Sequence, residues 1–258
     1  MRILISPAKK MNIDTDNLPY ENLPQFLPQT QQILAVLKNM DYTALKQLWK
    51  CSDKLAKYNF ERLQTINVTD NLTPAIFAYE GIQYQYMAPH VFENKHLHYI
   101  QEHLRILSGF YGMLRPFDGV LPYRLEMQAK LEIHSYHNLY QFWNHQLATQ
   151  LASETNLILN LASKEYSKAV LPYLSEDIQV ITCLFGEKKD GYIAEKGISC
   201  KMARGEMVRF LAENQITCAD DITTFQRLNY TFSKEDSTRN TFVFLKQRSE
   251  SKSAKPEA

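Results

Sequence analysis

The sequence predicts an α/β fold in which a mixed sheet is surrounded by helices. Short apolar runs bounded by turn residues indicate buried strands, and the clearest are residues 3–5, 157–161 and 180–184. Between them lie longer segments whose apolar residues recur at helical spacing. Strands that alternate with helices in this way normally form a sheet with helices packed on it. The 45% apolar content is enough for a large core.

The chain of 258 residues reads as one domain. It has no internal repeat, and no stretch is rich enough in Gly, Pro or Ser to act as a linker. Residues 248–258 are polar and lack the apolar side chains that a packed segment needs. We therefore expect a single domain over residues 1–247 and a disordered polar tail at 248–258.

Charge and cysteine usage narrow the functional class. The net charge of +1 means that nucleic-acid contacts would need lysine and arginine gathered on one face. The four cysteines are far apart and form no CxxC pair, and the histidines have no ligand spacing. We expect no metal site, no cofactor and no disulfide framework. Because no apolar run approaches 18 residues, we also expect a cytoplasmic protein without membrane contact.

The first hundred residues predict one strand, three helices and a second strand. The strand at 3–5 ends at Ser6-Pro7 and is followed directly by Lys9. A long loop over 12–28 leads to two helices that are separated at Met40-Asp41, with Asp41 as a cap. Ser52 is the expected cap of a third helix over 54–63. A second strand is predicted at 74–79, where Glu80-Gly81 stops it.

Residues 99–115 are predicted to be a helix-hairpin-helix-like element. Apolar residues recur at helical spacing before Gly109, and prolines beyond residue 115 break any helix. Gly109 and Gly112 would let backbone N–H groups converge on an anion, which suits a phosphate. The alternative is a plain glycine cap at the end of a helix, followed by a loop.

The C-terminal half alternates helices and strands. A helix over 139–147 is expected with Asn138 as its cap, and the strand at 157–161 carries a polar Asn160. Further strands are predicted at 180–184, 193–199, 225–232 and 241–246. A helix through residues 207–211 has Lys201 and Arg204 near its expected start. Since a helix start favours anions, cations there hint at a bound anion between them.

Polar residues follow several of the predicted strands. They include Lys9 after the first strand, Ser163 after the strand at 157–161, and Lys201 after the strand at 193–199. In a sheet these ends can meet in one positively lined cleft. We expect this convergence to bring Lys9, Arg124 and Arg204 close together.

Several long blocks, in order along the chain, resemble the YaaA family of peroxide-stress proteins. The match covers roughly residues 1 to 247, and the blocks are Ile5-Ser6-Pro7-Ala8-Lys9, Leu107-Ser108-Gly109-Phe110-Tyr111-Gly112-Met113-Leu114-Arg115-Pro116, Pro122-Tyr123-Arg124-Leu125-Glu126-Met127, Leu139-Tyr140-Gln141-Phe142-Trp143, Asn160-Leu161-Ala162-Ser163-Lys164-Glu165-Tyr166 and Lys201-Met202-Ala203-Arg204-Gly205. The resemblance implies a cytoplasmic protein that limits peroxide damage by lowering free intracellular iron. It also implies a mixed α/β body with a helix-hairpin-helix element, a positive cleft and DNA binding.

Two functional classes follow. The first is a nucleic-acid-binding stress protein that holds the backbone of duplex DNA, and its affinity should fall steeply with salt. Its contacts would be Lys9, Ser108, Gly109, Gly112, Arg115, Arg124, Lys201 and Arg204. The second is an enzyme acting on a nucleotide-like or other anionic small molecule. Polar residues of the same cleft would support it: Tyr123, Glu126, Asn160, Ser163 and Tyr166. A deep pocket would favour the enzyme, and an open groove would favour DNA.

Overall fold

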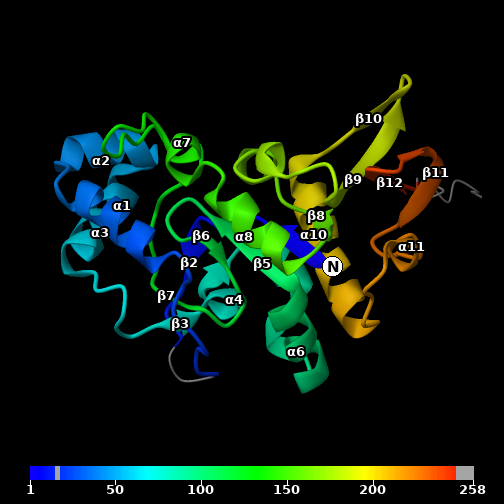
Figure 1. Ribbon diagram of the computed structural model, residues 1–258, viewed down its shortest axis with the longest axis horizontal. Helices are drawn as coiled ribbons and strands as arrows, with labels where there is room; N and C mark the ends of the chain where they lie inside the picture. The colour runs from blue at the N-terminus through cyan, green and yellow to red at the C-terminus, as the bar shows by residue number, and fades with distance from the viewer. Residues whose placement is uncertain (15–17, 248–258) are drawn as a thin grey trace, which may run out of the picture.

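The structure, a computed structural model, describes residues 1–14 and 18–247. It is α/β, with a mixed eight-stranded sheet flanked by helices, as the sequence predicts (Figure 1). The polar tail expected at 248–258 lies outside the described residues.

Five parallel strands form the centre of the sheet, and antiparallel strands complete it. The order of the main path is β11-β12-β9-β8-β1-β5-β6, with β10 pairing β9. The strands are β1 (Arg2–Ile5), β5 (Leu104–Ser108), β6 (Gly112–Leu114), β8 (Leu157–Asn160), β9 (Gln179–Lys189), β10 (Tyr192–Ala194), β11 (Tyr230–Thr238) and β12 (Thr241–Lys246). The parallel pairs are β12 with β9, β9 with β8, β8 with β1, and β1 with β5.

Strand β1 lies inside the sheet, between β8 and β5. Ile3 pairs with Leu104 of β5 on one side and with Leu159 of β8 on the other. Its apolar run is fully buried, as expected for a parallel strand covered on both faces. The chain adds β5 on one side of β1 and later returns to add β8 on the other. The crevice at the carboxyl ends of such a pair is the usual ligand site in open α/β sheets.

Helices cover the sheet, and the N-terminal ones lie together at one end of the molecule (Figure 1). The helices are α1 (Leu27–Lys38), α2 (Tyr42–Trp49), α3 (Asp53–Thr65), α4 (Ala75–Ala78), α5 (Ile82–Met87), α6 (Asn94–His103), α7 (Leu139–Trp143), α8 (Gln146–Glu154), α9 (Lys164–Ser167), α10 (Gly197–Glu213) and α11 (Ala219–Ile222), with 3-10 turns at Pro89–Val91 and Leu171–Tyr173. Two small ladders join β2 (Lys10–Met11) to β4 (Tyr79–Glu80), and β3 (Thr73–Pro74) to β7 (Gly119–Val120).

Two of the three predicted helix caps are confirmed by hydrogen bonds. The Asp41 side chain accepts from the backbone N–H of Ala44, and the Asn138 side chain accepts from that of Gln141. Ser52 does precede α3, but its side chain makes no capping hydrogen bond.

The segment 99–115 is not a helix-hairpin-helix. Helix α6 ends at His103, and residues 104–108 form a strand that turns directly into β6. Leu104–Ser108 is buried throughout, so its apolar side chains satisfy a helical and a two-sided strand pattern equally well. Pairing with β1 decides in favour of the strand. The prediction was wrong because the deciding partner lies far away in the sequence.

Three other predicted strands differ from the structure. Residues 75–78 are a short buried helix, α4, in place of the strand predicted over 74–79. The strand predicted at 193–199 stops at Ala194, and α10 begins at Gly197. Strand β11 begins only at Tyr230. As a result, Lys201 and Arg204 lie inside α10 and not before its start.

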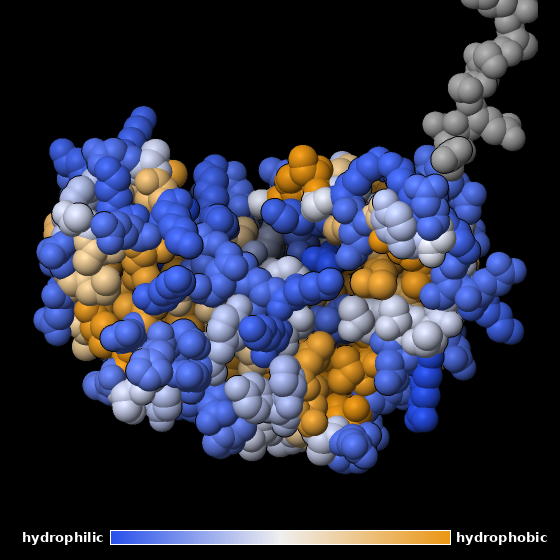
Figure 2. Space-filling model, turned by 90° about the horizontal axis from the view of Figure 1, so that it is seen from above, coloured by the Kyte–Doolittle hydropathy of each residue, from blue (hydrophilic) through white to orange (hydrophobic). Residues whose placement is uncertain are grey.

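The surface seen from above in Figure 2 is largely hydrophilic, with apolar side chains exposed in separate patches. In the part of the chain that the structure describes, no helix has the length and apolarity needed to cross a bilayer.

Candidate anion-binding site

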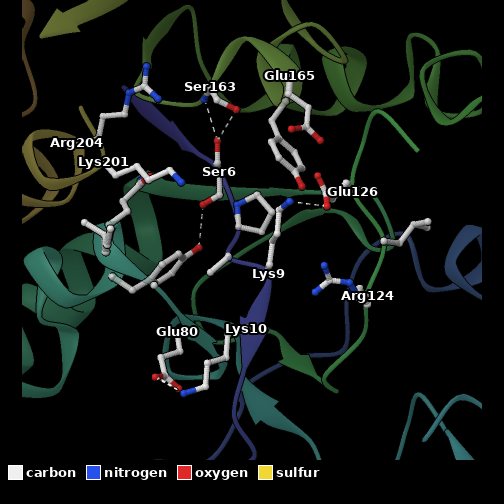
Figure 3. Close-up of a pocket in the computed structure, with 18 of the residues that line it drawn as sticks. Ser6, Lys9, Lys10, Glu80, Arg124, Glu126, Ser163, Glu165, Lys201 and Arg204 are labelled. Carbon is white, nitrogen blue, oxygen red and sulfur yellow. Dashed lines mark hydrogen bonds and ion pairs between the residues drawn. The ribbon is translucent and has the colours of Figure 1, made fainter. Parts of the chain in front are cut away.

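A pocket of about 430 Å³ lies at the carboxyl end of β1, where the strand order predicts a ligand crevice (Figure 3). We call it the β1 pocket. Five parts of the chain line it: residues 6–10 after β1, residues 80–84 of β4 and α5, residues 123–126, residues 163, 165 and 166 after β8, and residues 201 and 204 of α10. Its volume is within the range of about 300–1,000 Å³ typical of small-molecule sites.

Ser6 ties together the walls of this pocket. Its Oγ accepts a hydrogen bond from the backbone N–H of Ser163 at 2.9 Å, which joins the turns after β1 and β8. Its carbonyl oxygen accepts from the hydroxyl of Tyr84 at 3.1 Å, which fixes α5 beside them. The floor of the pocket is therefore held by hydrogen bonds between elements distant in sequence.

Two of the lysines that line the pocket are paired with carboxylates. Lys9 Nζ lies 2.7 Å from Glu126 Oε1, and Lys10 Nζ lies 2.5 Å from Glu80 Oε1. Both lysine side chains are largely exposed, so solvent screens these pairs and they add little stability. The lysines remain able to exchange these partners for an anionic ligand.

The other three cations are less well compensated. Within the described residues, neither Arg124 nor Lys201 has a carboxylate within 4 Å, and Arg204 Nη2 is 3.9 Å from Glu195 Oε1. The Nε atoms of Arg124 and Arg204 are also buried without a hydrogen-bond partner among the described residues. A buried unpaired donor costs roughly 1–3 kcal/mol of stability. Groups kept at such a cost are typical of binding sites.

Two carboxylates, Glu126 and Glu165, lie near each other on the wall opposite α10 (Figure 3). Burial raises the pKa of Glu165, and the negative charge of Glu126 raises it further. The backbone N–H of Gln128 donates to Glu165 Oε1 at 3.3 Å and partly opposes this rise. Glu165 therefore binds a proton more readily than an exposed glutamate does.

The tyrosines of the pocket are neutral hydrogen-bonding groups. The hydroxyl of Tyr123 lies 2.7 Å from Ser108 Oγ and 2.9 Å from the hydroxyl of Tyr79. Burial raises the pKa of Tyr123 to about 12, and it raises those of Tyr84 and Tyr166 as well. These phenols stay protonated near neutral pH and do not add negative charge beside the cations.

The convergence predicted from the sequence is present: Lys9, Arg124 and Arg204 line one pocket. Figure 3 shows them approaching it from three sides. The other predicted residues that line it are Lys201, Tyr123, Glu126, Ser163 and Tyr166.

Ser108, Gly109 and Gly112 are buried in the β5–β6 hairpin and do not line the pocket. Ser108 Oγ accepts the backbone N–H groups of Phe110 and Tyr111, so these amides are not free for a phosphate. A Cβ at Gly109 would lie 2.9 Å from the Leu125 carbonyl oxygen. At Gly112, which has a φ of +74°, it would lie 2.8 Å from the Trp143 ring. Both glycines serve turn geometry and close packing.

Arg115 and Asn160 also lie outside the pocket. Arg115 is exposed, on the turn after β6. Asn160 is buried at the end of β8, where its Oδ1 accepts from the Ala162 N–H and its Nδ2 donates to Thr182 Oγ1. It shapes the turn that carries Ser163, and this is a structural role.

Sequence reasoning did not select Glu165, Lys10 or residues 80–84 as site residues. Glu165 is two residues beyond Ser163, at the end of a predicted strand, and this position could have identified it as a site residue. Glu80 and Gly81 also follow a predicted strand, at 74–79, but residues 75–78 form a short helix instead, and α5 places residues 82–84 at the pocket. Among the described residues, no group of three or more His, Cys, Asp or Glu could hold a metal ion.

Comparison with known proteins gives consistent matches over nearly the whole chain. A family model described as "Peroxide stress protein YaaA" matches residues 1–236. A "UPF0246 protein" of Pediococcus pentosaceus is 55% identical over 246 residues, covering 95% of this chain and 98% of the relative. A "UPF0246 protein" of Lactiplantibacillus plantarum is 52% identical over 247 residues, covering 96% of this chain and 100% of the relative. The chain therefore belongs to the YaaA (UPF0246) family of peroxide stress proteins.

Proposed function

We propose that this protein acts in the peroxide stress response by binding a phosphate group of the duplex DNA backbone at the β1 pocket. Family membership supports the stress role. The observation that carries the binding role is the gathering of Lys9, Arg124, Lys201 and Arg204 around one pocket. Phosphates are held by this kind of charge-assisted contact, with arginine offering paired donors.

The charge of the residues that line the pocket supports this proposal, whereas the net charge of the whole chain does not. The whole chain has a net charge of only +1. The pocket has five basic residues against three acidic ones: Lys9, Lys10, Arg124, Lys201 and Arg204, against Glu80, Glu126 and Glu165. A local excess of positive charge attracts an anion to the pocket without making the whole surface bind anions non-specifically.

The test is a salt titration of duplex DNA binding. We expect affinity to fall linearly on a log–log plot as salt rises, with a slope that becomes shallower in Arg204→Gln. Arg209→Gln is the matched control, because Arg209 lies on the same helix and pairs with Glu213 away from the pocket. An affinity independent of salt, or equal losses in the two variants, would exclude this binding mode.

We further propose that binding in the cytoplasm is how the protein lowers free iron under peroxide stress. Cells that lack the protein should contain more chelatable iron, and the wild-type chain should restore the normal level. Arg204→Gln should fail to restore it, whereas Arg209→Gln should succeed. If Arg204→Gln fully restored the normal iron level, the lowering of free iron would not depend on binding at the pocket.

A second candidate function is an enzyme that acts on an anionic small molecule. The observation in its favour is that the site is a defined pocket in which Glu126 and Glu165 face the cations. Such carboxylates can take part in proton transfer. In this case Glu165→Gln should abolish peroxide resistance while DNA binding stays unchanged.

A further inference from the structure

The two sides of the β1 pocket differ in charge: α10 contributes two cations, whereas the opposite side has two carboxylates accompanied by Lys9 and Arg124. In Figure 3, Lys201 and Arg204 lie on the α10 side, and Glu126 and Glu165 lie across the pocket from them. Among the described residues, the carboxylate near these two cations is that of Glu195, which does not line the pocket and whose Oε1 lies 3.9 Å from Arg204 Nη2. A ligand that fits both ends must therefore be an anion at one end and a hydrogen-bond donor at the other.

The apolar residues that line the pocket between its two sides indicate the chemistry of the middle part of the ligand. Apolar groups of Pro7, Ala8, Ile82 and Leu125 contribute to the walls. Such a surface suits a sugar or a ring better than a chain of charges. At about 430 Å³ the pocket is also larger than a lone phosphate needs.

The carboxylate end is suited to neutral donors such as hydroxyl or amino groups. Glu126 is already paired with Lys9, and Glu165 receives one backbone N–H. Each carboxylate has further lone pairs with which to accept from a ligand. Arg124 lies on this side and adds donors for ring or sugar oxygens (Figure 3).

We propose that the β1 pocket binds a nucleoside monophosphate unit in one orientation, with its phosphate between Lys201 and Arg204 and its hydroxyl or amino donors on Glu126 and Glu165. This inference rests on the proposed function, since it takes the pocket to be a phosphate site. It adds the size of the ligand, its second functional end and its direction. The unit is either free or part of a DNA strand.

Calorimetric titration of the full chain with three probes tests the ligand class. The probes are deoxyadenosine monophosphate, deoxyadenosine and inorganic phosphate. We expect the nucleotide to bind about tenfold or more tightly than phosphate, because it engages both ends, and the nucleoside to bind weakly. Equal affinities for the nucleotide and for phosphate would overturn the inference.

Two variants test the orientation. Arg204→Gln should weaken the nucleotide and inorganic phosphate alike, by about tenfold or more. Glu165→Gln should weaken the nucleotide but leave phosphate binding unchanged. Arg209→Gln should change neither, and circular dichroism checks that all three variants fold. If Glu165→Gln weakened phosphate as much as the nucleotide, the assigned direction would be wrong.

Competition between the nucleotide and duplex DNA distinguishes a failure of this inference from a failure of the proposed function, which is DNA binding at the pocket. Displacement of the duplex by the nucleotide supports a strand as the source of the unit. Nucleotide binding without displacement supports a free nucleotide. If the duplex binds through Arg204 but the nucleotide does not bind, this inference fails and the proposed function stands. If neither the duplex nor any phosphate probe binds, both fail.

Discussion

Glu165 shows how a residue of the pocket lowers the stability of the fold. Burial, and then the charge of Glu126, raises the pKa of its carboxyl in the folded state. Between the unfolded value near 4.5 and this raised value, the folded state binds more protons than the unfolded state. Stability therefore falls as pH rises through that interval, and the ionised carboxyl is unfavourable at neutral pH.

We expect Glu165→Gln to raise the melting temperature at pH 7, because it removes this unfavourable charge. The gain should shrink as pH is lowered towards 4, where Glu165 is mostly protonated in both states. Melting curves of the two proteins at several pH values measure the difference. A variant that is less stable than the wild type at pH 7 would contradict the account.

Glu154 has the opposite effect at the other end of the sheet. Its Oε2 accepts from Arg2 Nε at 2.8 Å and from Arg105 Nη2 at 2.6 Å. Burial raises the pKa of Glu154, but Arg105 and Arg2 outweigh it, so the pKa lies below its usual value. The stability that this carboxylate provides is thus present above about pH 4.5. It is lost as pH falls through the lowered pKa.

Glu154→Ala should destabilise the protein by about 3–5 kcal/mol at pH 7, because it leaves the buried guanidinium of Arg105 without its partner. The loss should be smaller below pH 4, and urea titration measures it. As a control, Lys46→Gln breaks an exposed pair with Asp53 and should change stability very little.

At the scale of elements, the contact between α10 and α5 sets one wall of the β1 pocket. Helix α10 carries Lys201 and Arg204, and α5 carries Tyr84. The two helices touch at Gly205, where an ideal Cβ would lie 2.1 Å from the carbonyl oxygen of Gln83. Only glycine allows this distance, so one residue determines how close the cations come to the rest of the pocket.

Gly205→Ala should force α10 away from α5, because the obstructing atom is backbone and cannot rotate aside. We expect a loss of about 1–3 kcal/mol, as for overpacked cores, together with weaker phosphate binding. Thermal melting with and without phosphate measures both effects. Gly197→Ala, at the start of the same helix with nothing within 4 Å of its Cβ, should weaken neither stability nor phosphate binding, because alanine fits there and favours the helix.

At the scale of the whole molecule, β1 depends on partners far along the chain. Its neighbours are β5 and β8, and both must be present for its backbone to be paired. Forming such contacts requires closing long loops, which delays them relative to local helices.

We expect the amides of β1 to become protected from hydrogen exchange only when those of β5 and β8 do. Pulse-labelling during refolding, read out by mass spectrometry, follows the three strands separately. Helix α3, whose hydrogen bonds are local, should be protected no later than β1. Protection of β1 before β8 would show that β1 and β5 form a stable pair alone.

Much of the fold follows from local pattern. The strands at 3–5 and 157–161 were predicted because they are short apolar runs, and the strand at 241–246 was predicted because Phe242 and Phe244 alternate with other residues; the observed strands are 2–5, 157–160 and 241–246. The caps at Asp41 and Asn138 were predicted because their side chains act within three residues. The site was predicted in part for a similar reason: Lys9 and Ser163 each follow a strand, and strand ends gather at one edge of a parallel sheet.

The errors arise where the deciding interaction is not local. Residues 104–108 are a strand because β1 pairs with them, and 75–78 are a helix although their four buried residues fit either structure. Gly109 looked like a phosphate-binding turn, but the backbone at Leu125 lies against it. A sequence shows a glycine and cannot show what approaches it.

The sequence by itself determined the fold class, the family and the kinds of residue in the site, because these depend on local pattern and on blocks of identity. Only the tertiary structure decided which cations share a pocket, which glycines are buried, and that Glu165 faces Lys201 and Arg204 across it. The physical reason is that charge, burial and pKa depend on neighbours in space, and packing of β1 between β5 and β8 supplies those neighbours.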